Sequence, residues 1–197
     1  LERIASYATP QDILRRSVAE LKTLKEQKIG ILYMGVESGD DEVLKRIKKN
    51  ATHDEMVEAG RKVKEAGILL SVTVILGLGG IEGSSRHVSE TARILTEMDP
   101  DYAGALTLTL IPETPIYKEL ERGEFELVTP FDSLQELKGM VEQSTFTNCF
   151  FSSMHASNYF SMRGSMPKDK AKVLKQLDTI LSSQDPRLLR PEYMRGL

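Results

Sequence analysis

The sequence predicts an α/β protein whose central strands run parallel in one sheet. Three apolar runs rich in β-forming residues, at 29–36, 68–76 and 103–111, are typical of strands covered on both faces. Segments of helical length separate these runs, and such alternation implies right-handed crossovers between parallel strands. A barrel, a barrel fragment and a doubly wound sheet all satisfy this pattern.

The first third of the chain predicts a strand and two helices around the first apolar run. Residues 2–8 form a short strand candidate. Thr9 as N-cap and Pro10 in the first turn begin a helix, whose apolar positions recur at helical spacing to about residue 27. Residues 37–41 then turn the chain into another short helix.

The middle third continues with three helices that follow recognisable start signals. Thr52-His53-Asp54-Glu55 is a capping box, in which Thr and Glu bond to each other's backbone amides. The glycine-rich residues 77–80 lead from the second apolar run into a helix that ends near residue 98. Thr114 and Pro115 begin a short helix that ends near Gly123.

The pattern changes after Gly123. Asp132 or Ser133 is expected to cap a helix that runs to about Ser144. Residues 145–164 are polar and aromatic without a helical or strand period. An amphipathic helix is expected to open at 165–167, and the tail from Ser182 is expected to be loosely packed.

Composition excludes several classes of function. The 197 residues carry a net charge of −3 with both signs mixed, which does not favour a broad nucleic-acid-binding face. No apolar run approaches the ~18 residues of a membrane span, and no targeting signal opens the chain, so a cytoplasmic location without membrane contact is expected. Because Cys149 is the single cysteine, the chain can form no internal disulfide and cannot supply three thiolates to an iron–sulfur cluster. The chain opens on Leu1 in mid-pattern, which suggests a piece of a longer protein.

The carboxyl ends of the first two apolar runs carry residues suited to ligands, which in parallel α/β folds bind at that edge. Glu37 could accept from a ribose hydroxyl or an ammonium group, or it could simply cap the next helix. The Gly77-Leu78-Gly79-Gly80 turn could admit an anion to the backbone, or it could be only a tight strand–helix turn. Thr73 and Ile75 share one face of their strand, and a core threonine is the ordinary explanation of that pattern.

The third run ends in Leu110-Ile111-Pro112-Glu113-Thr114-Pro115, where an apolar ledge with free backbone groups suits an adenine ring or forms a rigid turn only. The spacing of His53, His87 and His155 does not favour metal binding, and the first two are interpreted as surface-helix residues. Cys149, which is followed by Phe150 and Phe151, is expected to be a buried, unreactive thiol.

Four segments in this order and spacing resemble the radical S-adenosylmethionine (SAM) superfamily. The branch that is most similar includes the Elongator catalytic subunit, the tRNA methylthiotransferases and the coproporphyrinogen dehydrogenases. The segments that carry the resemblance are Gly35-Val36-Glu37-Ser38-Gly39-Asp40-Asp41-Glu42-Val43-Leu44-Lys45, Lys64-Glu65-Ala66-Gly67-Ile68, Val74-Ile75-Leu76-Gly77-Leu78-Gly79-Gly80 and Leu110-Ile111-Pro112-Glu113-Thr114-Pro115.

The resemblance implies a partial TIM-type (β/α) barrel, with strands three to six of a (β/α)6 barrel in residues 1–123 and a mainly helical extension in 124–197. It implies SAM across the carboxyl ends of the strands and a [4Fe-4S] cluster that cleaves SAM to a radical. The family's C-x3-C-x2-C cluster loop is absent from this chain, so the resemblance implies that the cluster's cysteines lie outside it. The chain would then be inactive alone and part of an enzyme when joined to the missing N-terminal part.

Carried over position by position, the resemblance assigns roles to individual residues. Glu37 matches a polar residue that faces SAM, Lys49 falls near the SAM carboxylate, and Thr73 falls at a ribose-binding position. Ile75 and Ile111 would flank the adenine. The full set expected to bind the cofactor is Glu37, Ser38, Lys49, Thr73, Ile75, Gly77, Gly79 and Ile111.

The extension is expected to supply substrate contacts through His155, Ser157, Asn158 and Tyr159, although a structural loop explains these residues equally well. Two other classes stay open: a SAM- or nucleotide-binding module without a cluster, and a structural α/β module that pairs with a partner chain. An open sheet edge makes self-association plausible. Three ordered cysteines upstream of Leu1 would favour the enzyme, and a start codon just before Leu1 would exclude it.

Overall fold

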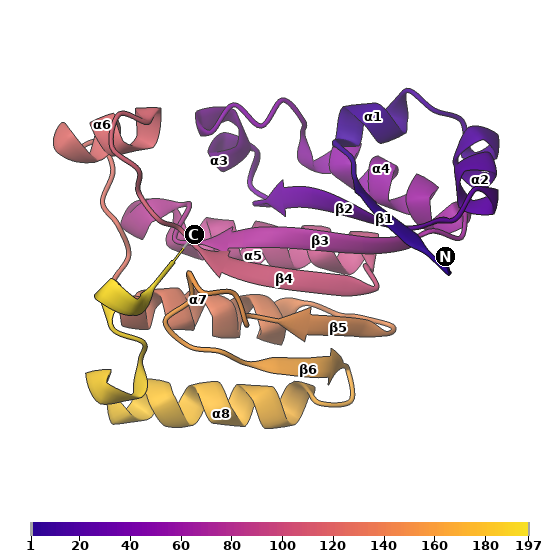
Figure 1. Cartoon of the computed structure of the whole chain (residues 1–197). Coiled ribbons are helices and arrows are strands. Elements are labelled where there is room, and N and C mark those ends of the chain that lie inside the picture. Colours follow the sequence, from indigo (N-terminus) through magenta and orange to yellow (C-terminus); the bar gives the residue numbers. More distant parts are fainter. Residues whose placement is uncertain (1, 197) are drawn as a thin grey trace.

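A single six-stranded sheet organises the chain in the computed structural model, which describes residues 2–196 (Figure 1). The strands lie in chain order, β1 to β5 are parallel, and β6 is antiparallel to β5. Their bounds are β1 (Ile4–Tyr7), β2 (Ile29–Glu37), β3 (Leu69–Leu76), β4 (Tyr102–Thr107), β5 (Cys149–Ser152) and β6 (Arg163–Met166).

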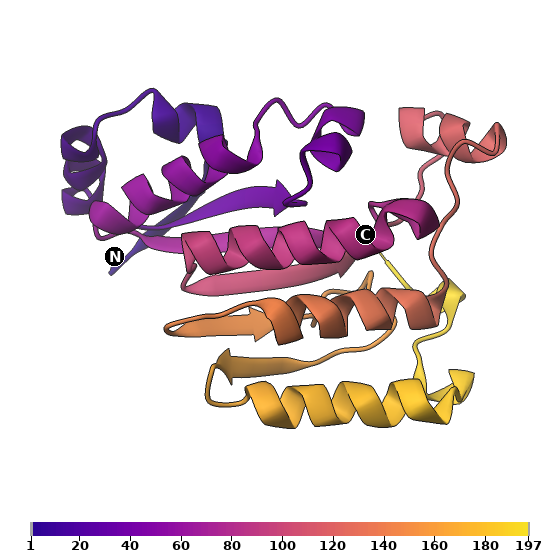
Figure 2. The ribbon, with the colours of Figure 1, turned by 180° about the vertical axis from the view of Figure 1, so that it is seen from behind.

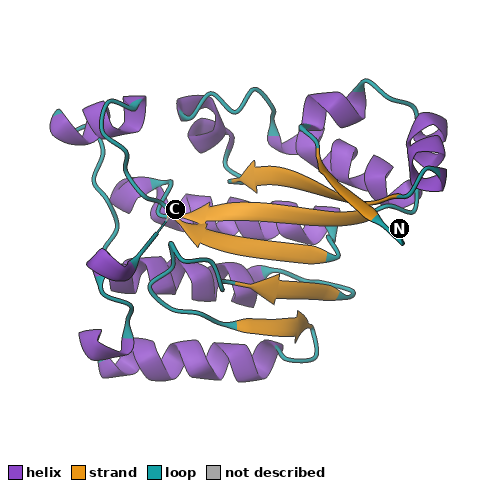
Figure 3. Cartoon of the chain, viewed as in Figure 1, coloured by secondary structure: helices purple, strands orange, loops and turns teal. Residues whose placement is uncertain are grey.

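Helices cover one face of this sheet, and no helix of residues 2–196 lies on the opposite face (Figures 2 and 3). The longest helices, α4, α5, α7 and α8, lie side by side behind the strands in the view of Figure 1. The helices are α1 (Pro10–Leu14), α2 (Val18–Glu26), α3 (Asp41–Arg46), α4 (His53–Glu65), α5 (Gly80–Met98), α6 (Pro115–Glu121), α7 (Pro130–Gln143) and α8 (Lys170–Ser183). Two 3-10 turns, Pro186–Leu188 and Glu192–Met194, follow α8.

Burial alternates along the strands because only one face is covered. In β3, Leu70, Val72, Val74 and Leu76 are buried under the helices. Thr73 and Ile75 point to the opposite face and are partly exposed. The expectation that these strands are covered on both faces is therefore wrong for the described residues, and we call the uncovered side the open face.

Most predicted elements are confirmed, with three differences in the first 130 residues. The helix expected from Pro10 onward is split because Ser17 forms a second capping box with Glu20 and begins α2. The strand β4 ends at Thr107, before the expected limit. The helix α7 begins earlier than expected, because Thr129 caps it and Asp132 completes the capping box.

The region interpreted as aperiodic contains two strands. Residues 145–164 include β5 and the start of β6, and these strands extend the sheet beyond β4. Each has four residues, of which only two face the core, so neither produces a periodic signal over a useful window. The last helix consequently begins at Lys170, after β6, and the extension combines two helices with two strands.

The tail after α8 is mostly exposed, as expected of a loosely packed segment, but two of its residues anchor it to the rest of the chain. Leu189 is buried against Leu134, Tyr159 and Ile180 in a second apolar cluster. The Arg195 side chain is only 5% exposed. The tail contacts the rest of the chain through irregularly spaced arginines and one leucine. Such contacts produce no hydrophobic periodicity, so the sequence pattern does not predict them. Among residues 2–196, no helix combines the length and apolar character that crossing a bilayer requires.

Candidate functional site at the carboxyl edge

A bulge at the end of β2 brings two predicted residues together on the open face. The register with β3 shifts between Gly35, which pairs with Thr73, and Glu37, which pairs with Val74. Glu37 has a left-handed φ of 65°. Bulges of this kind often redirect a side chain beside a functional site. The Glu37 carboxylate turns back over Gly35 and accepts a hydrogen bond from Lys49 Nζ at 2.9 Å.

The glycine at position 35 leaves the space that this ion pair occupies, and a side chain there would displace the Glu37 carboxylate. A Cβ there would lie 2.1 Å from Glu37 Oε1 and 3.0 Å from Lys49 Nζ. The two side chains are 20% and 21% exposed, so the pair is partly shielded from solvent and still accessible. Glu37 does not cap the following helix, because Asp40 accepts the Glu42 amide hydrogen bond at 3.0 Å and serves as N-cap.

Small side chains form a row across the open face next to this pair. The register places Gly35, Thr73, Gly104 and Ser152 opposite one another on four neighbouring strands. One step toward the amino ends, a parallel row is mostly aromatic, formed by Tyr7, Tyr33, Ser71, Tyr102 and Phe150. Bulky side chains therefore limit the amino side, and the backbone is most accessible near the carboxyl edge, where parallel α/β folds bind ligands.

Ser38 lies beneath this edge and joins the ends of β2 and β3 through a buried histidine. Ser38 Oγ lies 2.8 Å from His87 Nδ1, and His87 Nε2 lies 3.0 Å from the Ile75 carbonyl oxygen. Since a carbonyl only accepts, Nε2 carries the proton and Nδ1 accepts from Ser38. Burial lowers the pKa of His87 to about 4, so the ring is neutral at pH 7.

The interpretation of His53 and His87 as surface residues is wrong. His87 is fully buried and His53 is 1% exposed, with its Nδ1 2.9 Å from the Gly39 carbonyl oxygen. His87 bonds to a backbone carbonyl at the end of β3, and His53 bonds to one in the turn after β2. A polar residue on an apolar helix face looks like a surface residue until its buried partner is known.

The turn after β3 is shaped by a second buried titratable group, Glu136 of α7. Its carboxylate accepts hydrogen bonds from the Gly77 amide and from Ser84 Oγ, both at 2.6 Å. Burial raises the pKa of Glu136 to about 7. Gly77 and Gly80 adopt φ values of 82° and 67°, which favour glycine.

The two predicted glycines of this turn therefore lie away from the open face. The Gly77 amide is already bonded to Glu136. Gly79 packs against α5, where a Cβ would lie 2.9 Å from His87 Cβ. Ile111, the remaining predicted cofactor residue, is 46% exposed on the loop after β4. The structure thus gathers Glu37, Lys49, Thr73 and Ile75 on one face, and leaves Ser38, Gly77 and Gly79 in supporting positions.

The predicted substrate residues form a bonded loop at the end of β4. Ser157 Oγ accepts from the Thr107 amide at 3.1 Å, and Asn158 Nδ2 donates to the Ala105 carbonyl at 2.8 Å. His155 is exposed and lies with its Nδ1 2.9 Å from Ser157 Oγ. Tyr159 donates its hydroxyl to Glu192 at 2.8 Å. This bonding supports the structural explanation of the loop, and a substrate contact by His155 stays a prediction.

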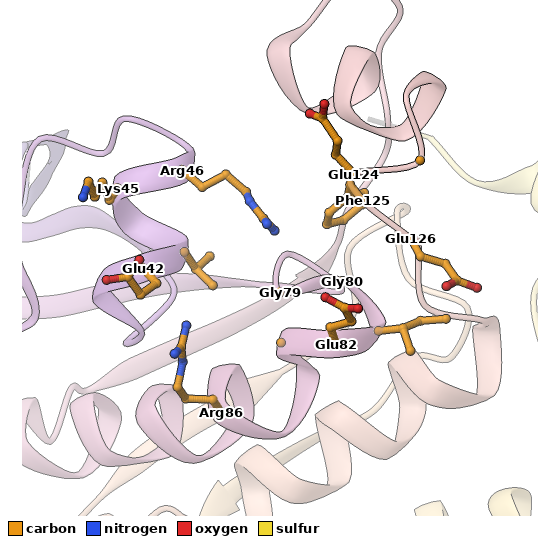
Figure 4. Close-up of a pocket in the computed structure, with 14 residues that line it drawn as sticks. Glu42, Lys45, Arg46, Gly79, Gly80, Glu82, Arg86, Glu124, Phe125 and Glu126 are labelled. Carbon is orange, nitrogen blue, oxygen red and sulfur yellow. The ribbon is translucent and has the colours of Figure 1, made fainter.

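A pocket of about 620 Å³ opens beside the candidate site, between α3, the start of α5 and residues 123–126 (Figure 4). Arg46 projects into it and lies over the Phe125 ring at 5.7 Å. Its lining mixes both signs, with Lys45, Arg46 and Arg86 against Glu42, Glu82, Glu124 and Glu126. Because Arg86 already pairs with Asp40 at 2.7 Å and Arg46 with Glu119 at 3.4 Å, the pocket has no strong preference for an anion.

The residues of this chain do not fit an iron–sulfur cluster. Cys149 is buried as predicted, and burial raises the pKa of its thiol to about 12, which disfavours the thiolate that binds metal. Within the part of the chain that the structure describes, no group of three or more His, Cys, Asp or Glu side chains is arranged to bind a metal ion.

Four residues important to this edge were not predicted. Gly35 was named only as the first residue of the segment 35–45 that carries the resemblance. Gly104 was not singled out, and it pairs with Thr73 on the neighbouring strand. His87 and Glu136 were missed because their partners lie far away in sequence. The spacing of 59 residues between Gly77 and Glu136 leaves no local signal.

A parallel sheet with helices on one face and charged residues at its carboxyl edge places this protein among the (β/α)-barrel folds. Residues 5–92, somewhat less than half of the chain, match the sequence profile of the radical SAM superfamily.

Two curated proteins are similar to this chain in sequence, and two solved structures are similar to it in fold. The heme chaperone HemW of Bacillus subtilis is 24% identical over 82% of this chain and 44% of its own length. A probable threonylcarbamoyladenosine tRNA methylthiotransferase of Methanocaldococcus jannaschii is 32% identical over 42% of this chain and 19% of its own length. The fold is similar to coproporphyrinogen III oxidase (HemN) from Escherichia coli, with a TM-score of 0.58 at 17% identity over 88% of this chain and 37% of that one. It is also similar to Methanocaldococcus infernus Elp3, with a TM-score of 0.57 at 19% identity over 70% of this chain and 32% of that one.

The chain spans less than half the length of the curated relatives that it matches. The similarity to the solved structures shows the fold. Activity, substrate and partners therefore have to be argued from the chain's own residues.

Proposed function

We propose that this chain binds SAM on the open face, at the carboxyl edge of its sheet, and that it forms part of a radical SAM enzyme. In that larger protein, a [4Fe-4S] cluster ligated by cysteines outside this chain would supply reductive cleavage of SAM and substrate hydrogen abstraction. The chain's own contribution is to bind and orient SAM.

The observation that carries this proposal is the Glu37–Lys49 ion pair. The methionine part of SAM ends in an ammonium and a carboxylate on one carbon, and the pair offers one partner for each. The 2.9 Å separation and partial exposure mean that both charges are presented together at the surface. The glycine at position 35 keeps the backbone beside them free of a side chain.

Neighbouring residues would then contact the rest of SAM. Thr73 can donate to or accept from a ribose hydroxyl, and it lies opposite Gly35 in the register. Ile75 continues the same face toward the carboxyl edge, and Ile111 offers an exposed apolar surface after β4. With these contacts, the methionine part of SAM would lie at the end of β2, the ribose over β3, and the adenine toward the loop after β4.

The partners proposed for the chain follow from the same geometry. Among the residues that the structure describes, β1 pairs with β2 and with no other strand, so its other side is an open edge that an N-terminal part of a longer protein, or a second copy, could extend. Strands added beside β1 could curve the sheet and so cover part of the apolar and aromatic side chains on the open face.

Removing either charge of the Glu37–Lys49 pair is expected to weaken SAM binding. In titration calorimetry, Glu37→Ala and Lys49→Ala should each raise the Kd of SAM about tenfold, because each deletes one charge-assisted hydrogen bond. Lys138→Ala, which removes one partner of the Lys138–Asp178 ion pair on the helix side, is the matched control and should leave the Kd unchanged. Equal affinities for all four proteins would contradict the assignment of this pair to SAM.

A further inference from the structure

Arg195 of the tail is inserted between two loops at the carboxyl edge of the sheet. Its Nη2 donates to the Leu108 carbonyl oxygen at 2.9 Å and to Thr109 Oγ1 at 3.3 Å, directly after β4. Its Nε donates to the Ser157 carbonyl oxygen at 2.6 Å, in the loop after β5. The guanidinium therefore bridges two segments that are almost fifty residues apart in sequence.

The remaining contacts fix the direction of this guanidinium. It lies 4.2 Å from the centroid of the Tyr159 ring, and Nη1 donates to the Tyr159 hydroxyl oxygen at 2.6 Å. Nη1 also donates to both carboxylate oxygens of Glu192, at 2.7 and 2.9 Å. The side chain is 5% exposed, so a charge is buried here with its partners in place.

The bridged segments meet where the adenine end of SAM is proposed to bind. The Leu108–Thr109 segment leads within two residues to Ile111, and the loop 155–159 packs on Thr107 and Ala105 at the end of β4. The tail brings the chain back to this edge, near the ends of β3 and β4 (Figure 1).

We propose that Arg195 is a positioning residue that sets the loop after β4 for the adenine end of SAM. This inference rests on the proposed function. Arg195 does not touch the ligand; it fixes Leu108 and Thr109, and these fix the apolar ledge at Ile111. The fork of five guanidinium N–H donors suits a site where one side chain must bond to several carbonyl and hydroxyl oxygens, which lysine cannot reproduce.

The loop positioning is tested first by hydrogen–deuterium exchange on the 197-residue chain without ligand. Arg195→Gln should speed amide exchange in residues 106–112 and 155–160 about tenfold, with little change in β2 and β3, because the loss is local. Arg187→Gln removes the same charge from an exposed tail position that pairs only with Asp185, and it should leave both segments unchanged. Unchanged exchange in Arg195→Gln, or an equal increase over the whole sheet, would overturn the positioning role.

The link to SAM is tested by competition between SAM and its two halves. Arg195→Gln and Arg195→Lys should raise the inhibition constant of adenosine about fivefold and leave that of methionine unchanged. Glu37→Ala should do the reverse. An equal loss for both competitors, or no loss, would overturn the inference while leaving the SAM site intact. A wild-type chain that binds no SAM would instead overturn the proposed function, with the exchange result still deciding the loop positioning.

Discussion

Replacing Glu136 with glutamine is expected to raise the free energy of unfolding at pH 8 by about 3 kcal/mol relative to the wild type. At pH 4 the two proteins should be equally stable. The expectation follows from the burial of this carboxyl beneath the turn after β3, which raises its pKa from 4.5 to about 7.

The direction of the effect comes from proton linkage. Between pH 4.5 and 7 the folded state keeps a proton on Glu136 that the unfolded state has released, so the folded protein is progressively destabilised as the pH rises. Above pH 7 both states are ionised and the full cost of the buried charge is present. Glutamine has no charge to bury, and its carbonyl can still accept from the Gly77 amide while its NH2 faces Ser84 Oγ.

Urea denaturation at half-unit steps from pH 4 to pH 8 measures this difference. Burial depresses the pKa of His87 and makes that residue destabilising at low pH, but it is present in both proteins and cancels in the comparison. Glu142→Gln removes a carboxylate from an exposed position of the same helix and should follow the wild-type curve. Parallel curves for wild type and Glu136→Gln would show that the carboxyl is not buried as the structure places it.

The backbone framework could be predicted from the sequence because its signals are local. The N-caps Thr9, Thr52 and Thr114 were all predicted, and each accepts the expected amide hydrogen bond. The long apolar runs predicted β2, β3 and β4 because each presents several consecutive residues to a core. The four-residue strands β5 and β6 lacked that length, and their place in the sheet depends on a partner strand.

The candidate site could be predicted in part, and the reason again lies in the range of the interactions. The resemblance pointed to Glu37 and Lys49, and the structure pairs them. No local sequence pattern predicts the bulge that turns Glu37 back over Gly35, because the bulge is a shift in the pairing of β2 with β3, which are distant in sequence. The roles of His87, Glu136 and Arg195 depend on partners that are 12 to 87 residues distant in sequence.

Replacing Gly39 with alanine is expected to lower the free energy of unfolding by about 3 kcal/mol, near the upper end of the range for overpacked sites. Gly39 follows Ser38 at the end of β2 and lies directly against α5. A Cβ at this position would lie 2.1 Å from the Glu90 carbonyl oxygen, 2.5 Å from its carbon and 2.8 Å from the Thr91 nitrogen. All three are backbone atoms, so no side chain can rotate away and the helix itself must move.

A glycine within α5 itself, the helix that Gly39 contacts, provides the matched control. A Cβ at Gly83 meets nothing within 4 Å, so Gly83→Ala should raise the stability by about 0.5–1 kcal/mol through the helix preference for alanine. Urea denaturation of the two variants separates the steric effect at Gly39 from a general effect of adding a methyl group. A small loss for Gly39→Ala would show that the end of β2 can move away from α5.

The same contact connects stability to the candidate site. The Gly39 amide donates to Thr91 Oγ1 at 3.0 Å, one turn beyond His87 on α5, so backbone and side chains join β2 to the helix at the same point. If alanine at position 39 pushes the end of β2 and α5 apart, Ser38 and Glu37 must shift as well, because they directly precede residue 39 in the chain. We therefore expect Gly39→Ala to weaken SAM binding by an amount comparable to Glu37→Ala, although residue 39 presents no side chain to the ligand.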